Sequence, residues 1–237
     1  MKIAVVIPAY NEQDALAAVL RRIPSTLARH AVMPIVVDDG SKDQTAAQAR
    51  SIKGVTLLRH RTNLGKGAAA KTGCDAAYKM GAHVIVLMDG DGQHLPEDLG
   101  RMIGPLLKSE APGLVIGTRP MDHRMPLAMK IGNFILSVLA RLFFNIRVKD
   151  TQSGFRCFGR SVYPLIRWHA SNYAMETEML ILAAKHGVRC GEVPIDTIYL
   201  DHYKGTTIFD GLRIVKTLLK WRLLWFRVYR SLEPFSV

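Results

Sequence analysis

Residues 84–98 read VIVLMDGDGQHLPED, an apolar run that ends in two aspartates one residue apart. VIVLM has the length and the β-branched content of a buried strand. A tight turn needs glycine, but it does not need two carboxylates one residue apart. Because close carboxylates repel unless a cation lies between them, Asp89 and Asp91 predict a Mg²⁺ or Mn²⁺ site, in which Gln93 could add an amide oxygen or orient a bound water. A solvated acidic turn is the alternative that this motif alone leaves open.

Short apolar runs alternate with segments of helical length on both sides of this stretch. The expected strands are 3–7, 35–37, 55–59, 84–88 and 113–118, and the expected helices lie near 12–29, 43–51, 66–80 and 96–108. This alternation predicts an α/β fold with a mostly parallel sheet covered on both faces. Ligands of such sheets bind at the carboxyl ends of the strands. Three polar clusters fall there: PAYNE (8–12), DDGS (38–41) and DGDGQH (89–94).

The pattern changes after residue 119, although no linker or repeat interrupts the chain. The expected segments are a helix at 126–146, a glycine-rich polar segment at 150–160, a helix near 174–186 and a strand at 190–199. We predict one domain over residues 1–207. Residues 208–237 are predicted to form a basic, aromatic, amphipathic helical extension.

Composition indicates a globular protein that favours anionic partners. The 237 residues are 49% hydrophobic and 22% charged, and 32 Lys and Arg against 20 acids give a net charge of +12. This charge favours nucleotide phosphates, anionic lipid or nucleic acid. The three cysteines show no metal-site spacing and suggest reduced thiols in a cytosolic protein. We expect neither a signal peptide nor a transmembrane helix, so that membrane contact would be peripheral.

Other motifs at strand ends each have a functional and a plain structural interpretation. NLGKGAAAKTG (63–73) lacks the spacing of a P-loop, and we interpret it as a loop-to-helix junction rather than a phosphate site. One carboxylate of the pair Asp38 and Asp39 could accept hydrogen bonds from a nucleotide base or ribose, and Arg119 could bind a phosphate or simply lie at the surface.

Two segments carry features of membrane contact. Asn133, Ser137, Arg141 and Asn145 form a polar row on an otherwise apolar helix, which fits either bundle packing or a helix lying among lipid headgroups. The tail at 208–232 mixes tryptophans with six Lys and Arg, which suits a membrane interface but also packing on the main domain.

With these motifs together, the sequence resembles the family 2 glycosyltransferases of GT-A fold, and among them the dolichyl- or polyprenyl-phosphate mannose and glucose synthases. The resemblance covers about residues 3–208 and rests on seven blocks in the family's order. These are VVIPAYNE, VVDDGSKDQT, NLGKGAAAKTG, MDGDGQHLPEDL, IGTR, DTQSGFRCF and EVPI.

The resemblance implies roles for individual positions. Those that would bind the nucleotide and donor sugar are Pro8, Tyr10, Glu12, Val37, Asp39, Asp89, Gly90 and Gln93. Those on the acceptor side would be Ser153, Arg156, Lys130 and Ser137. Asp91 and Arg119 would act in catalysis, and the metal would sit on Asp89, Asp91 and Gln93. The segment after EVPI departs from the family pattern, so that Lys204 or His202 would have to supply the cation expected there.

These features predict an inverting, metal-dependent transfer of a hexose from a GDP- or UDP-sugar to a polyprenyl phosphate at the cytoplasmic face of a membrane. A lipid phosphate needs no general base, whereas a hydroxyl acceptor would need one, with Asp150, Glu176 or Glu178 as candidates. A transferase to a sugar or lipid hydroxyl is the first alternative. A non-catalytic basic membrane-binding module is another, and nucleic acid is not expected as a partner because the aromatic residues cluster in one tail.

Overall fold

The computed structural model of the chain describes residues 1–108, 110–120, 125, 127–198, 216, 219 and 222. The strands are β1 (Lys2–Ala9), β2 (Thr26–Leu27), β3 (His30–Asp38), β4 (Thr56–Arg59), β5 (Val84–Leu87), β6 (Leu114–Thr118), β7 (Arg156–Gly159) and β8 (Cys190–Pro194). The helices are α1 (Leu16–Arg22), α2 (Thr45–Ser51), α3 (Lys66–Lys79), α4 (Leu99–Ile103), α5 (Leu127–Phe144), α6 (Tyr163–Ile166) and α7 (Met175–Lys185). Two 3₁₀ turns, η1 (Pro96–Asp98) and η2 (Gly104–Leu107), flank α4.

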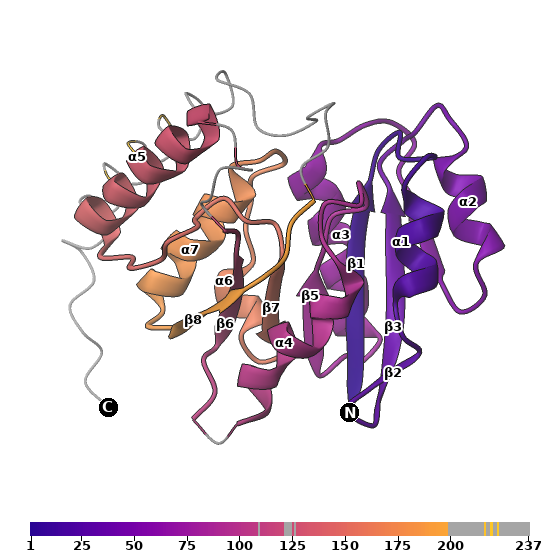
Figure 1. Cartoon of the computed structure of the whole chain (residues 1–237), viewed down its shortest axis with the longest axis horizontal. Coiled ribbons are helices and arrows are strands. Elements are labelled where there is room, and N and C mark those ends of the chain that lie inside the picture. The colour runs from indigo at the N-terminus through magenta and orange to yellow at the C-terminus, as the bar shows by residue number, and fades with distance from the viewer. Residues whose placement is uncertain are drawn as a thin grey trace.

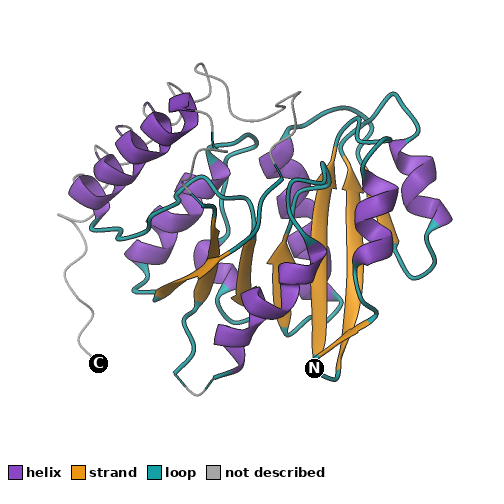
Figure 2. Ribbon diagram, viewed as in Figure 1, coloured by secondary structure: helices purple, strands orange, loops and turns teal. Residues whose placement is uncertain are grey.

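One mixed sheet runs through the described chain (Figures 1 and 2). Its order is β2-β3-β1-β5-β7-β6-β8, and β4 pairs with β3. The pairs β4–β3, β3–β1, β1–β5 and β6–β8 are parallel, whereas β7 is antiparallel to both β5 and β6. β6 therefore points the same way as β1, β3 and β5, and the carboxyl ends of these strands lie along one edge of the sheet.

Helices cover both faces of the sheet, as the alternation of apolar runs predicts. On one face the buried side chains of α3, α5, α6 and α7 pack against alternate sheet residues such as Val6, Ile85 and Phe158. On the other face α1, α2 and α4 pack against the neighbouring positions, such as Val5 and Val86. Residues adjacent along a strand point to opposite faces, so a continuous apolar strand fills two cores.

Four predicted elements were wrong in extent. The strand expected at 35–37 is the longer β3, His30–Asp38. The helix expected at 12–29 ends at Arg22, because Pro24 cannot continue it and the chain turns into the β2–β3 hairpin. The helix expected at 96–108 is split between η1, α4 and η2, and the strand expected at 190–199 ends at Pro194.

The strand β7 was missed entirely, since it was taken as part of a polar segment. Its four residues pair with both β5 and β6. β7 therefore separates these two strands in the sheet, although they are consecutive in the predicted order. Its side chains are largely apolar and buried, but the run is too short to show a period.

Helix α5 packs only one side on the domain. Leu136, Ala140 and Phe144 are buried in the core. Its polar row is divided, since Asn133 is buried and Arg141 is exposed. The side chains of Asn133 and Ser137 both donate hydrogen bonds to the carbonyl of Lys149, at 3.0 and 3.3 Å. The polar row thus partly serves to hold the chain that follows the helix. In the described part of the chain, no helix combines the length and the apolar character that crossing a bilayer requires.

Candidate active site

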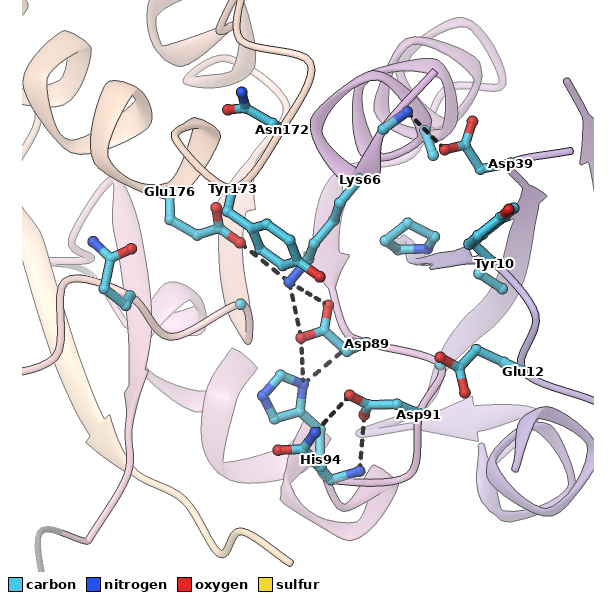
Figure 3. Close-up of a pocket in the computed structure, with 18 of the residues that line it drawn as sticks. Tyr10, Glu12, Asp39, Lys66, Asp89, Asp91, His94, Asn172, Tyr173 and Glu176 are labelled. Atoms are coloured by element: carbon cyan, nitrogen blue, oxygen red, sulfur yellow. Dashed lines mark hydrogen bonds and ion pairs between the residues drawn. The ribbon is translucent and has the colours of Figure 1, made fainter. Parts of the chain in front are cut away.

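A pocket of about 410 Å³ opens at the carboxyl edge of the sheet, where the polar clusters of the sequence meet (Figure 3). It is lined by Pro8, Ala9, Tyr10, Glu12, Asp39, Asn63, Gly65, Lys66, Ala69, Asp89, Gly90, Asp91, Gln93, His94, Arg119, Gln152, Gly154, Asn172, Tyr173, Glu176 and Thr197. The three clusters predicted to lie together therefore do so. The segments around the starts of α3 and α7 also line the pocket, which is completed by Arg119, Gln152, Gly154 and Thr197.

The centre of the pocket is an ion cluster around Lys66. Its Nζ lies 2.8 Å from Asp89 Oδ1 and 3.1 Å from Glu176 Oε1. Burial acts to lower the pKa of Lys66, but the charges of Asp89 and Glu176 outweigh it and raise that pKa. Likewise, burial acts to raise the pKa of Asp89, but the Lys66 charge outweighs it and lowers that pKa. Lys66 thus keeps a positive charge between two carboxylates from different parts of the chain.

The loop before α3 places Lys66 by means of Asp39. The carboxylate of Asp39 accepts hydrogen bonds from the amides of Leu64 and Gly65, at 2.9 and 2.8 Å. Gly65 has a φ of +97°, and a Cβ on it would lie 2.3 Å from the carbonyl oxygen of Ser171. Only glycine therefore lets this loop pass so close to the segment before α7.

Asp91 is the carboxylate of the pair that suits a divalent cation. Asp91 accepts hydrogen bonds from the backbone amide and the side-chain amide of Gln93, at 3.0 and 2.8 Å. Burial and the neighbouring charge of Asp89 raise the pKa of Asp91, so a cation beside it would favour its charged form. Mg²⁺ binds through one or two carboxylates and takes its other ligands from phosphates and water. Asp91, with Asp89 and Gln93 beside it, fits that requirement. The described residues contain no group of three or more His, Cys, Asp or Glu that could hold a metal, so the remaining ligands would have to come from phosphate and water.

His94 belongs to the site, although its sequence position suggested no role. Its ring is buried, packs on Phe155 at a centroid distance of 5.1 Å, and lines the pocket. Its Nδ1 accepts the backbone N–H of Asp89 at 3.2 Å, which assigns the proton of the neutral ring to Nε2. Burial lowers the pKa of His94 and so favours this neutral form. The ring therefore holds the DGD turn against the sheet.

Arg119 reaches the pocket from the end of β6, as predicted. Its guanidinium donates two hydrogen bonds to Asp150, at 2.7 and 2.9 Å, and Asp150 is fully buried. A fixed guanidinium of this kind has the geometry to face a phosphate. Among the carboxylates considered as general bases, Asp150 is engaged by Arg119 and Glu178 accepts the amides of His169 and Ala170. Glu176 is the one that lines the pocket.

Several residues predicted for the site lie outside the pocket lining. Val37 is fully buried in the sheet, and Ser153 is buried behind the lining residue Gly154. The guanidinium of Arg156 is buried and donates to three backbone carbonyls, those of Thr151, Ser153 and Glu176. Its position therefore makes it a brace between β7 and α7.

The remaining predicted positions lie on α5 or beyond the described residues. Lys130 is partly exposed and Ser137 bonds to the chain after the helix, and neither lines the pocket. Lys204 and His202 lie outside the described residues, as does most of the 208–237 extension.

Sequence reasoning missed Lys66, Asn172 and Tyr173. Lys66 was present in the NLGK motif, but that motif was interpreted as a plain loop-to-helix junction. The signal that could have found Lys66 is its charge at the first helical residue, opposite a DGD motif that needs a cation. Nothing in the local sequence of Asn172 and Tyr173 indicates a site, because only the fold brings them beside Lys66.

The fold and the pocket define a glycosyltransferase of GT-A fold. The model of the family "Glycosyl transferase family 2" matches residues 4–164, and the chain belongs to that family. The predicted similarity to dolichyl- and polyprenyl-phosphate sugar transferases is confirmed, because its relatives include such enzymes.

Named relatives match over nearly the whole chain. A UDP-N-acetylglucosamine–dolichyl-phosphate N-acetylglucosaminyltransferase of Methanococcus voltae is 33% identical over 93% of this chain and 96% of its own. The polyprenol monophosphomannose synthase of Mycolicibacterium smegmatis is 27% identical over 91% of this chain and 84% of its own. Glucosyl-3-phosphoglycerate synthase of Mycobacterium tuberculosis, solved with Mn²⁺, UDP and its product, has a TM-score of 0.73 and 22% identity over 92% of this chain and 79% of its own. That structural similarity shows a shared fold and nothing more.

Removal of the central cation should produce a pH-dependent loss of stability. Lys66→Met leaves Asp89 and Glu176 buried without a positive charge, so we expect the free energy of unfolding to fall by about 3 kcal/mol at pH 7. Because Asp89 has a lowered pKa when folded, the contribution of Lys66 is present above the unfolded carboxyl pKa of about 4 and is lost as the pH falls through the folded pKa. Urea unfolding at neutral and acidic pH measures the difference.

Lys79→Met is the matched control, since Lys79 is exposed at the other end of the same helix. It should change the free energy of unfolding little at either pH. A deficit in Lys66→Met that is equal at both pH values would contradict the proposed charge cluster.

Proposed function

We propose that this enzyme transfers a sugar from a UDP-sugar to a polyprenyl phosphate at the cytoplasmic face of a membrane, with inversion at the anomeric carbon. The observation that carries the proposal is a pocket in which a DGDGQ turn, a buried lysine and a fixed arginine meet at the carboxyl edge of the sheet. The names of the relatives support a lipid phosphate as acceptor, and one of them, at 33% identity, supports UDP. A GDP-sugar is an outcome that the experiment below distinguishes.

The nucleotide is proposed to bind on the β1–β3 side of the pocket, against Pro8, Tyr10 and Glu12. Oδ2 of Asp39 accepts one backbone amide, that of Gly65, and has a second lone pair available for a base or ribose donor. Val37 would support this side from within the sheet. The diphosphate then lies over the DGD turn, where Gly90 lines the pocket without a side chain.

The chain's own residues would stabilise the charge that grows on the leaving diphosphate. Arg119 is fixed by Asp150 in a position to donate to a phosphate oxygen, and such a preorganised donor stabilises developing charge without reorganisation. A divalent cation held by Asp91, Asp89 and Gln93 would neutralise part of the same charge. The acceptor phosphate oxygen is already anionic, so the attack needs no general base. Of the residues expected on the acceptor side, Lys130 and Ser137 lie on α5 outside the pocket lining, and the buried Ser153 and Arg156 would support the segment that carries Gly154. Lys204 lies outside the described residues.

The outward face of α5 is proposed to meet the membrane. It carries five exposed apolar side chains, those of Ile131, Phe134, Ile135, Val138 and Leu142. Phe134 and Leu142 are 67% and 69% exposed, which is unusual for large apolar residues on one helix face. The net charge of +12 adds attraction to an anionic leaflet. A polyprenyl acceptor would then approach from the membrane alongside this helix.

The transfer reaction is tested with a panel of UDP- and GDP-sugars, Mg²⁺ or Mn²⁺, and a polyprenyl phosphate. We expect one UDP-sugar to yield an organic-soluble sugar phosphate, and Asp91→Asn to reduce the rate at least hundredfold, which corresponds to about 2.7 kcal/mol of transition-state stabilisation. Asp14→Asn, at an exposed carboxylate outside the pocket lining, is the control and should retain the wild-type rate. Absence of lipid product with every donor would refute the acceptor, and full activity of Asp91→Asn would refute the role of the metal site.

Membrane contact is tested by the double substitution Phe134→Asn and Leu142→Asn. Each removes apolar surface worth about 1.5 kcal/mol or more when buried, so binding to anionic vesicles should weaken at least tenfold. Because both side chains are exposed, the thermal unfolding temperature should hardly change. Met80→Asn with Leu107→Asn, two exposed apolar side chains on other elements, is the control and should bind vesicles as the wild type does. Equal binding by all three proteins would show that α5 does not face the bilayer.

A further inference from the structure

Glu176 carries a buried carboxylate oxygen for which the described residues provide no hydrogen-bond partner. Its side chain is 3% exposed and lines the pocket, and Oε1 is engaged by Lys66 at 3.1 Å. Oε2 is buried and unpaired. Since a buried acceptor without a donor costs free energy, such an atom on a pocket wall indicates a ligand group that donates to it.

The position of Glu176 is fixed from three directions. Its backbone carbonyl accepts a hydrogen bond of 2.6 Å from Arg156, and its residue lies in the first turn of α7. Lys66 holds Oε1, and the same ammonium group holds Asp89. Glu176 is therefore preorganised, with Oε2 as the acceptor that remains for a ligand.

The pocket has two sides, divided by the Lys66–Asp89 pair (Figure 3). Tyr10, Glu12 and Asp39 lie on one side, whereas Glu176 lies on the other with Asn172. If the nucleotide occupies the first side and its diphosphate lies over the DGD turn, the sugar extends towards Glu176. The side that Glu176 occupies therefore offers a sugar an acceptor oxygen.

We propose that Oε2 of Glu176 accepts a hydrogen bond from one hydroxyl of the donor sugar and so selects which sugar is transferred. This inference rests on the proposed function, because it requires a nucleoside diphosphate sugar in the pocket. A site built to pair one sugar hydroxyl discriminates strongly against a sugar that lacks it, since the buried acceptor is then left unpaired. Lys66 contributes by holding the carboxylate in place.

Glu176→Gln is a sharp test because it keeps the shape of the side chain. Lys66 can donate but cannot accept, so it requires the amide oxygen at the Oε1 position. The amide NH₂ is then placed at the Oε2 position, so the sugar hydroxyl can no longer donate to a carboxylate oxygen in a charge-assisted hydrogen bond and can only accept a weaker, neutral one. We expect the affinity for the nucleoside diphosphate sugar that the wild type uses to fall at least tenfold, measured by calorimetry without any acceptor lipid. The affinity for the nucleoside diphosphate alone should stay within twofold.

A series of donor analogues, each lacking one sugar hydroxyl, identifies the partner of Oε2. One analogue should bind the wild type at least tenfold more weakly than the complete donor, and Glu176→Gln should not weaken its binding further. Such non-additivity is the signature of a direct contact. Glu110→Gln is the control: Glu110 is an exposed carboxylate outside the pocket lining, and the variant should leave the ratio of the two affinities unchanged. Glu176→Asp, which withdraws the carboxylate by one methylene, is the second variant if Glu176→Gln does not fold.

The outcomes separate this inference from the function on which it rests. If the wild type binds no nucleoside diphosphate sugar, the proposed function fails. If the wild type binds its donor but Glu176→Gln changes both affinities equally, or neither, Glu176 does not contact the sugar and the inference is overturned. A carboxylate that met only the acceptor would also leave donor binding unchanged, and that result would likewise overturn it.

Discussion

The site depends on one electrostatic constraint: carboxylates gathered at the end of a buried strand need positive charge beside them. Lys66 meets part of that need, because its ammonium lies within 3.1 Å of Asp89, which follows β5, and of Glu176, which lies on α7. The cluster therefore joins the first half of the chain to α7. Among the described residues Asp91 has no ion-pair partner of this kind, and burial together with the charge of Asp89 raises its pKa. Asp89 thus pairs with the ammonium of Lys66, whereas Asp91 is available to a bound cation.

The sheet brings these groups together because β1, β3, β5 and β6 point the same way and end at one edge. The hydrogen bonds of Asp39 to the loop before α3 then set the start of that helix, and with it Lys66. Gly65 permits this loop to approach Ser171. Gly154 plays a similar part, since a Cβ on it would lie 2.7 Å from Asp89 Oδ2. Close approach of backbone segments thus allows the charged side chains to meet.

The sequence was sufficient for the parallel strands, their polar ends and the acidic motif, because continuous apolar runs and glycine-carboxylate turns are local signals. β7 was missed because four residues carry no period, and its insertion between β5 and β6 depends on tertiary pairing. Lys66 and Glu176 lie far apart in the sequence, so their pairing could not be predicted from either motif. Arg156 was expected to contact the acceptor, but its buried guanidinium donates to three backbone carbonyls. No sequence motif indicates that these carbonyls need a donor.

In the proposed function, this edge of the sheet binds a nucleoside diphosphate through a divalent cation on Asp91. The most direct measurement is the binding of Mn²⁺, followed by electron paramagnetic resonance, with and without UDP or GDP. If metal and diphosphate share the site, each must increase the affinity for the other by the same factor. We expect Mn²⁺ to bind at least tenfold more tightly in the presence of the nucleotide. An affinity for Mn²⁺ that is the same with and without either nucleotide would contradict the account.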